Sequence, residues 1–245
     1  MKLEALIVAA AEISGPEREC MFALMARYYA GVKRDDFDAD LKEKHWVILL
    51  RDGDSHALCG FSTQMVLDFT IDGTSLHALF SGDTIVDRKC WGQSLLAQAW
   101  GRLAIELIER FPTGSLFWFL ISKGYKTYRY LPLFFREYYP RHTAPTPPWA
   151  QSIIDVLGRQ KYPRAYDPSA GIIRADGSAC RLRRDVAAIS EGRLRDPAVS
   201  FFVKKNPRHE LGDELCCIAP LTRENFSVAA QRPLRRNPEH QVAFG

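Results

Sequence analysis

The sequence contains 245 residues, of which 47% are hydrophobic, and its 33 basic and 29 acidic side chains give a formal net charge of +4 at pH 7. A chain of this length and composition can bury one large core. The mild charge does not by itself indicate a nucleic-acid-binding protein, because basic residues are scattered until a short cluster at 232–236 (RPLRR). A solvated tail is the simpler interpretation of that cluster.

The six cysteines form no C-x-x-C pair and match no zinc-ligand spacing. Several stand in apolar, strand-like runs, which indicates that they act as small hydrophobic side chains. Free thiols of this kind are typical of a reducing compartment. The apolar run near the start is interrupted by Glu4 and is too short for a secretory signal or a membrane span. We therefore expect a cytoplasmic protein with no metal, no membrane contact and no nucleic-acid partner.

The first half of the chain predicts a strand, a helix and a three-strand meander. Residues 3–10 are strand-like, and Pro16 fits the first turn of an amphipathic helix that follows. After a charged connection, strands are expected at 44–51, 57–69 and 75–86. They are joined at Asp52-Gly53 and Asp72-Gly73, which are turn signals between antiparallel strands.

The second half predicts helices around one buried strand. Residues 91–110 place apolar side chains on one helical face, and 115–121 (SLFWFLI) form a continuous apolar run typical of a central strand. A helix kinked by Pro132 is expected at 127–139. An irregular, proline-rich stretch with one helix follows, and strands at 199–204 and 214–219 close the pattern.

The stretch 76–96 is the most informative part of the sequence. A strand ends at a polar turn, Gly92 follows, and an apolar-periodic helix begins directly afterwards. This order leaves several backbone N–H groups unpaired at the helix N-terminus, where the helix dipole favours negative charge. The stretch therefore predicts a phosphate cradle, with a plain strand-to-helix connection as the alternative.

The order of elements resembles that of the Gcn5-related N-acetyltransferase (GNAT) superfamily over residues 1–140 and again near 199–222. The resemblance implies an α/β (α+β) fold, with a mixed, mainly antiparallel sheet flanked by helices on both faces. It also implies a single domain over 1–222 that includes a helical or irregular insertion at 141–197. Residues 223–245 are then expected to be an extended or partly disordered tail. We expect the insertion to fold onto the domain and to select the acceptor, since connections this long are usually functional or disordered.

In that superfamily the loop V-x-x-x-x-R-G-x-G-[IL]-[GA] holds the pyrophosphate of coenzyme A, and here Gly92 and Leu95 match it. Trp91 stands where arginine is usual, Ser94 where glycine is usual, and Leu96 where a small residue is usual. Arg88 and Lys89 are charged residues that could replace the missing arginine. The resemblance assigns cofactor binding to Ile85, Val86, Arg88, Lys89, Trp91, Gly92, Gln93, Ser94 and Ser122.

The same resemblance implies attack of an amine on a thioester, which needs a base for the amine and a proton donor for the leaving thiolate. Asp83 is the first candidate for the base, because a carboxylate in an apolar strand needs a reason to be there. A structural role for Asp83 at a β-bulge beside Gly82 is the alternative, and His77 is a weaker candidate base.

The usual acid, a tyrosine, aligns with Phe135, so a displaced phenol is expected from Tyr128 or Tyr130, or these tyrosines are packing residues. Cys90 lies at a helix N-terminus, which lowers a thiol pKa. No histidine is close to it in sequence, so a covalent intermediate is not expected.

The expected activity is transfer of an acyl group from acyl-coenzyme A, as acetyl-CoA or a longer acyl-CoA, to a small-molecule amine in a ternary complex. Two alternatives stay open: an acyl carrier protein as donor, and an inactive module that binds an acyl-thioester. The protein is expected to be a monomer or a homodimer.

Overall fold

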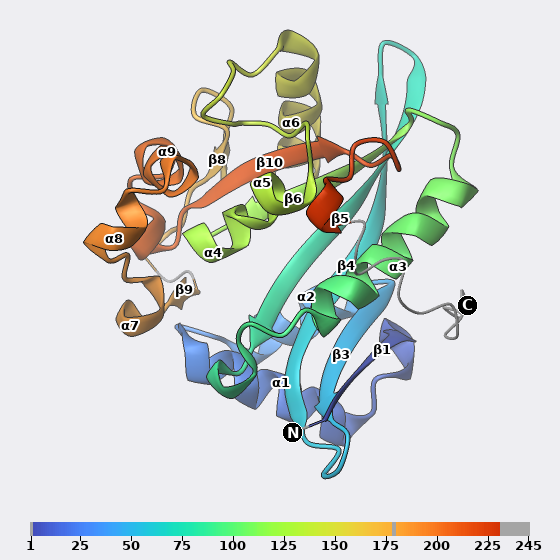
Figure 1. Ribbon diagram of the computed structural model, residues 1–245, viewed down its shortest axis with the longest axis vertical. Helices are drawn as coiled ribbons and strands as arrows, with labels where there is room; N and C mark the ends of the chain where they lie inside the picture. Colours follow the sequence, from blue (N-terminus) through green and yellow to red (C-terminus); the bar gives the residue numbers. More distant parts are fainter. Residues whose placement is uncertain (1, 178–179, 231–245) are drawn as a thin grey trace.

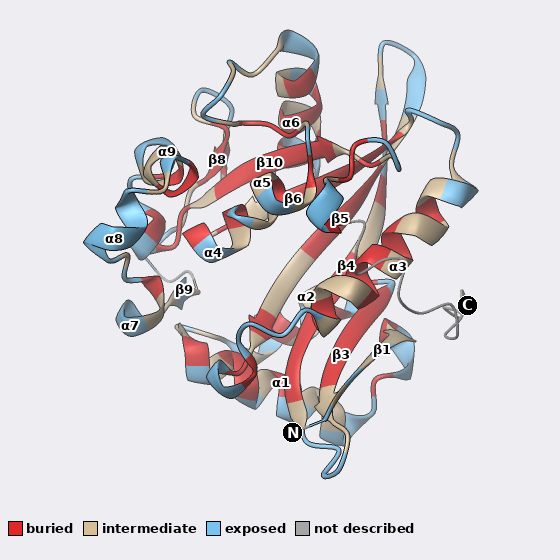
Figure 2. Ribbon diagram, in the orientation of Figure 1, coloured by how far each residue is buried: buried red, intermediate tan, exposed pale blue. Residues whose placement is uncertain are grey.

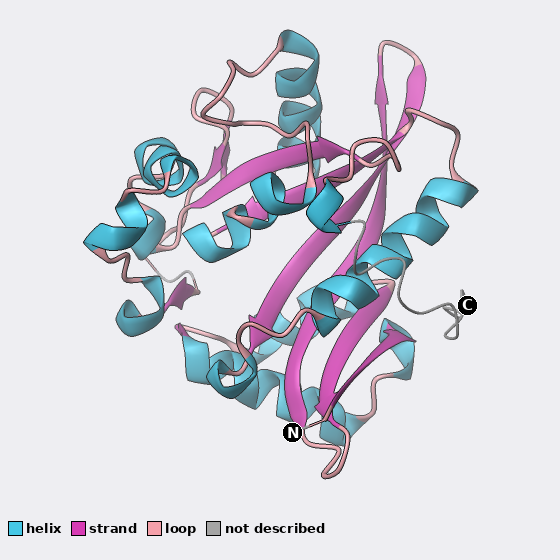
Figure 3. Ribbon diagram, in the orientation of Figure 1, coloured by secondary structure: helices cyan, strands magenta, loops and turns pink. Residues whose placement is uncertain are grey.

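The computed structural model describes residues 2–177 and 180–230. Its main sheet is built from strands β1 (Leu3–Ala9), β3 (Trp46–Asp52), β4 (Leu58–Ile71), β5 (Thr74–Val86), β6 (Leu116–Ser122), β7 (Tyr166–Asp167), β8 (Ile172–Ile173) and β10 (Glu214–Pro220). The strand order is β1-β3-β4-β5-β6-β10-β8-β7 (Figures 1 and 3). Every pairing in this sheet is antiparallel except that of β5 with β6.

A second, two-stranded sheet pairs β2 (Tyr29–Ala30) with β9 (Arg181–Leu182). The helices are α1 (Gly15–Tyr28), α2 (Arg34–Lys42), α3 (Leu95–Arg110), α4 (Tyr125–Tyr128), α5 (Tyr130–Phe134), α6 (Pro148–Lys161), α7 (Arg184–Ala187), α8 (Glu191–Leu194) and α9 (Pro197–Lys205). Three short 3-10 turns lie at Ala10–Glu12, Arg88–Cys90 and His209–Leu211. Within these described residues, no helix is both long and apolar enough to cross a bilayer.

The sheet is covered on both faces, because alternate residues of its strands point to opposite sides. Ile48 and Trp118 face α3 to α5 and α9, whereas their neighbours Val47 and Phe119 face the opposite layer of α1, α2 and α6. Both faces of the central strands are buried (Figure 2). The predicted fold, a mixed and mainly antiparallel sheet between two helical layers, is confirmed.

Three elements differ from the sequence prediction. Residues 199–204 are not a strand but most of α9, which starts where the Asp196 side chain accepts a hydrogen bond from the N–H of Ala198. The predicted helix at 127–139 is two short helices followed by extended chain. The charged connection before β3 contains α2, whose Phe37 and Leu41 are buried. Only one of the two predicted closing strands, β10, is therefore present.

The segment after α5 contributes to both sides of the molecule. Helix α6 buries Ile153, Ile154 and Leu157 against one face of the sheet, and β8 extends the sheet beyond β10. Strand β9 then crosses to pair with β2 beside α1. Residues 223–230 pack onto the extended chain after α5, where Phe226 bridges Phe135. The basic cluster at 232–236 lies outside the described residues.

Candidate active site

Strands β5 and β6 run parallel and then separate. Their ladder joins His77 to Leu116 and ends at the pair of Ser81 and Leu120, although β5 continues to Val86. On its other side β5 stays paired with β4 up to Val86. Within the part of the chain that the structure describes, the second half of β5 therefore has one paired edge and one edge without a neighbouring strand.

The separation begins at a β-bulge. Residues 62 and 64 of β4 face residues 84 and 81 of β5, so β5 has one extra residue at Gly82 and Asp83. A side chain at Gly82 would meet the Thr63 hydroxyl at 2.6 Å and the Lys44 stem at 2.9 Å, so close packing requires glycine here. The bulge that we weighed as an alternative role for Asp83 is present.

A buried hydrogen-bond hub holds the point of separation. The Ser81 hydroxyl oxygen accepts from the indole N–H of Trp118 at 2.9 Å and of Trp100 at 3.2 Å, and its hydroxyl donates to the Gln64 side chain at 2.7 Å. All four residues are buried. Because the hub ties α3, β4 and β6 to the last paired residue of β5, it fixes where the ladder stops.

A cavity of about 650 Å³ occupies the opening between the strands. Residues 82–86 of β5 line one side, and Ile121 and Lys123 line the other. Phe37 and Tyr162 in its wall belong to the layer of α1, α2 and α6, whereas Trp91 and Tyr130 lie with α3 to α5. The cavity thus reaches from one face of the sheet toward the other.

The predicted phosphate cradle forms one end of this cavity. Gly92 has φ +86°, a conformation that strongly favours glycine, and it turns the chain into α3. The Ser94 side chain does not cap the helix; its hydroxyl accepts from Gln98 instead. The first-turn N–H groups of α3 have no intrahelical acceptor and follow directly after the lining residues Trp91, Gly92 and Gln93, at the positive end of a 16-residue helix.

Cations gather at the same end around Trp91. The Lys126 ammonium lies 3.8 Å from the centre of the indole ring, and the Arg88 guanidinium lies 5.6 Å from it. Burial lowers the pKa of Lys126, and the positive charges of Arg88 and Arg193 lower it further. Arg88 pairs with Asp185, while Lys126 and Arg193 form no ion pair with a described residue. This surplus of positive charge suits a phosphate-bearing ligand.

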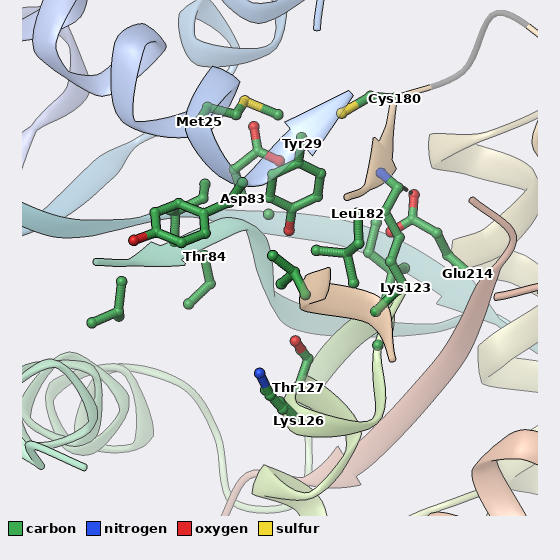
Figure 4. A pocket seen from close by; sticks show the side chains of 18 of the residues that line it. Met25, Tyr29, Asp83, Thr84, Lys123, Lys126, Thr127, Cys180, Leu182 and Glu214 are labelled. Atoms are coloured by element: carbon green, nitrogen blue, oxygen red, sulfur yellow. Dashed lines mark ion pairs between the residues drawn. The ribbon is translucent and has the colours of Figure 1, made fainter. Parts of the chain in front are cut away.

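Asp83 lines the cavity and forms no hydrogen bond or ion pair with any residue that the structure describes. Burial raises its pKa to about 6, and the Asp40 carboxylate contributes, although the nearby Lys123 opposes the rise. Lys123 pairs with Glu214 at 3.0 Å (Figure 4). Burial acts to lower the pKa of Lys123, but Glu214 and other neighbours raise it overall. A carboxylate with this pKa can accept a proton near neutral pH.

The two candidate tyrosines have different surroundings. Tyr130 lines the cavity, and burial raises its pKa. Tyr128 is fully buried outside the cavity lining, donates its hydroxyl to the Pro140 carbonyl at 2.9 Å, and packs on Phe202. Phe135, at the position where tyrosine is usual, packs in the core against Trp118.

The remaining predicted residues divide in the same way. Ile85, Val86, Trp91, Gly92 and Gln93 line the cavity, whereas Arg88, Lys89, Ser94 and Ser122 do not. Ser122 points away because strand neighbours alternate, so that Ile121 and Lys123 face the opening instead.

Two further residues were considered from the sequence: His77 lies outside the cavity lining, and Cys90 lies within it. His77 lies on the paired half of β5, with its ring nitrogen 2.6 Å from Asp68 and its ring stacked on Phe111. Burial raises the pKa of the Cys90 thiol to about 11, against the lowering expected at a helix N-terminus.

Several cavity residues were missed because they come from distant segments. Tyr29, on β2, lies beside Asp83 (Figure 4), and burial raises its pKa. Glu214 comes from β10, and Arg193 comes from α8. No local motif marks these positions, since β2 is two residues long and α8 has four.

Comparisons of sequence found no protein-family model and no curated protein that match this chain. Comparison of structures found similar folds. A conserved protein of unknown function from Enterococcus faecalis V583, described as a probable N-acyltransferase, is 11% identical with a TM-score of 0.41, covering 53% of this chain and 32% of that one. This chain thus spans about a third of that protein.

Two Escherichia coli structures also match. A GNAT family N-acetyltransferase in complex with CoA is 22% identical, covers 51% of this chain and 64% of that one, and has a TM-score of 0.35. The ribosomal-protein-S18-alanine N-acetyltransferase is 14% identical, covers 57% and 83%, and has a TM-score of 0.38. The meander of β3 to β5, the turn into α3, and the parallel strand β6 that parts from β5 are the features on which the sequence resemblance depends. These matches are a similarity of backbone over about half of this chain.

Proposed function

We propose that this protein is an acyltransferase that moves an acyl group from acyl-coenzyme A to the amine of a small-molecule acceptor by direct attack. The observation that carries the proposal is the unpaired edge of β5, which lies between a cation-rich helix N-terminus and an unpartnered carboxylate. A thioester on a phosphate-bearing arm would interact with all three: the cations with its phosphates, the strand edge with its arm, and the carboxylate with the attacking amine.

The donor end is supported by charge and by backbone geometry. Phosphates of the donor would contact the amides after Gly92 and the side chains of Lys126 and Arg193. The amide groups of the pantetheine arm would then bond to the unpaired edge of β5, as an added strand does. This arrangement would direct the thioester toward Asp83.

The chemistry in this proposal needs two proton transfers. The acceptor nitrogen attacks the thioester carbonyl carbon while Asp83 takes a proton from that nitrogen. The carbon–sulfur bond then breaks, and the Tyr130 hydroxyl gives a proton to the departing sulfur. Tyr130 is preferred to Tyr128 because it lines the cavity and Tyr128 donates to Pro140.

Calorimetry with coenzyme A and a thiol-release assay with acetyl-CoA and a panel of amines test the proposal together. We expect binding, and thiol release only when an amine is present. Binding without release on any amine would favour a module that only binds the ligand. Absence of CoA binding, together with transfer from an acylated carrier protein, would replace the donor.

A matched pair of variants tests the donor end. Lys126→Met should weaken CoA binding about tenfold, the size expected for loss of one charged contact to phosphate. Lys205→Met removes an exposed lysine at the end of α9 and should leave binding unchanged. Equal effects of the two variants would contradict the assignment of Lys126 to the donor phosphates.

A further inference from the structure

The end of the cavity opposite Trp91 is lined by carboxylates and aromatic rings. Its charged lining residues are Lys33, Asp36, Asp40, Asp83, Lys123 and Glu214, and its aromatic ones include Tyr29, Phe37, Phe80 and Tyr162. This composition differs from the cation-rich end, where Lys126, Arg129 and Arg193 line the wall. Carboxylates therefore outnumber lysines four to two in this part of the lining, whereas the charged residues around Lys126 are cations.

Most of these charges are already paired. Glu214 binds Lys123 at 3.0 Å, and Asp40 binds Lys44 at 2.6 Å. Lys161 of α6 lies 3.8 Å from Asp40 and pairs mainly with Glu43. Lys33 is exposed at the start of α2. The lining charges of this end that these pairs leave over are Lys33 and the two carboxylates considered next.

Two carboxylates in this end lack a partner. Asp36, in the first turn of α2, and Asp83, on the bulge of β5, form no hydrogen bond or ion pair with any described residue. Asp36 is exposed, whereas Asp83 is only partly exposed and lies beside Tyr29 in the cavity (Figure 4). Water solvates the exposed Asp36, whereas a carboxylate held inside the cavity without a partner, as Asp83 is, is costly unless a ligand pairs with it.

The aromatic walls suit the same kind of ligand. Phe37 and Phe80 are buried, and Tyr162 closes the wall from the end of α6. The ammonium groups of Lys44 and Lys161 already lie 5.8 Å from the centre of the Phe80 ring. Ring faces attract such cations and also pack against methylene groups. A ligand with two cationic groups separated by an aliphatic chain would pair with both carboxylates and contact the rings between them.

We propose that the acceptor is a small aliphatic diamine or polyamine, whose reacting amine is held at Asp83 and whose second ammonium group is held at Asp36. The role of Asp83 in this inference rests on the proposed transfer reaction. The binding of the second ammonium group at Asp36 does not depend on that reaction. Asp36 is thus a specificity-determining residue, and α2 is the element that carries it.

The experiment compares diamines with monoamines of the same chain length. Putrescine and cadaverine are tested against n-butylamine and n-pentylamine, with acetyl-CoA as donor. We expect a KM at least about tenfold lower for each diamine, since one charged contact contributes roughly that factor. Asp36→Asn should remove most of this advantage while kcat is retained.

Asp35→Asn is the matched control. Asp35 lies in the same first turn of α2 and is exposed, but it does not line the cavity. Both substitutions remove one charge from the same helix N-terminus, so an effect on helix stability would appear in both. A change in KM for diamines in Asp36→Asn alone supports the proposal.

The remaining outcomes separate this inference from the proposed function. Transfer with equal KM for monoamines and diamines overturns the inference and leaves the transferase function intact. If no amine is acylated, calorimetry with putrescine alone still tests the site: binding that is lost in Asp36→Asn and kept in Asp35→Asn supports the diamine site and contradicts the transferase. If the protein neither acylates an amine nor binds putrescine, both the diamine site and the transferase function are overturned.

Discussion

Replacing Asp83 with asparagine should raise the stability of this protein while it removes the proposed activity. Burial, with Asp40 as the next contribution, raises the pKa of the Asp83 carboxyl from 3.8 to about 6. Ionising this group at neutral pH therefore costs more in the folded protein than in the unfolded chain, by about 3 kcal/mol at about 1.36 kcal/mol per pH unit. The cost is absent below about pH 4, grows as the pH rises, and is complete above about pH 6.

Asparagine has nearly the same shape as aspartate and carries no charge. We therefore expect Asp83→Asn to be more stable than the parent at pH 7, by up to about 3 kcal/mol, and to match it at about pH 4. Urea unfolding at several pH values measures this difference. The same variant should lose transferase activity, because asparagine cannot accept the proton from the amine.

The pH dependence decides whether burial of the charge is the cause. A gain in stability of the same size at pH 4 and pH 7 would refute the reasoning, and so would a loss at pH 7. Asp35→Asn serves again as the control, since an exposed carboxylate on α2 should change stability little at either pH.

Three further outcomes follow from the contacts of the site. Lys123→Met should move the acid limb of the activity profile to higher pH, because Lys123 lowers the pKa of Asp83; an unmoved limb would mean that Asp83 is not the titrating base. Tyr130→Phe should lower kcat, whereas Tyr128→Phe should lower the free energy of unfolding by about 1 kcal/mol with kcat retained; the reverse pattern would assign the acid to Tyr128. Ser81→Ala should cost about 2 kcal/mol or more in urea unfolding, because it leaves the indole N–H groups of Trp100 and Trp118 without their acceptor; a near-neutral effect would show that the hub does not hold the separation of the strands.

Local sequence patterns predicted the elements that carry a strong periodic signal. The meander of β3 to β5 and the turn through Gly92 into α3 follow from alternating apolar runs and turn residues in the chain itself. Helix α9 was mistaken for a strand because Val199, Phe201 and Val203 favour strands in isolation. The capping pair Asp196 and Pro197 is the signal that identifies it as a helix.

The sequence named cavity-lining residues where one strand and one loop supply them, and it missed those that tertiary packing brings to the cavity. Asp83 and Gly92 lie on consecutive elements, so a single stretch of sequence contains both. Ser122 was assigned to the cavity without fixing the face on which it lies, and strand alternation places Ile121 and Lys123 there instead. Tyr29 and Arg193 reach the cavity only because β2 and α8 are packed against it, and no periodicity in either segment predicts this.

The insertion connects the two ends of the cavity. Its β9 pairs with β2 and places Leu182 in the wall, where a side chain at Gly124 would meet it at 2.9 Å. Helix α8 supplies Arg193 near the donor end, while Lys161 of α6 holds Glu43 beside the C-terminal end of α2. The same segment therefore contacts both the proposed phosphate site and the helix that carries Asp36. A change in the insertion should alter donor affinity and acceptor selectivity together, which distinguishes it from a cover over the acceptor alone.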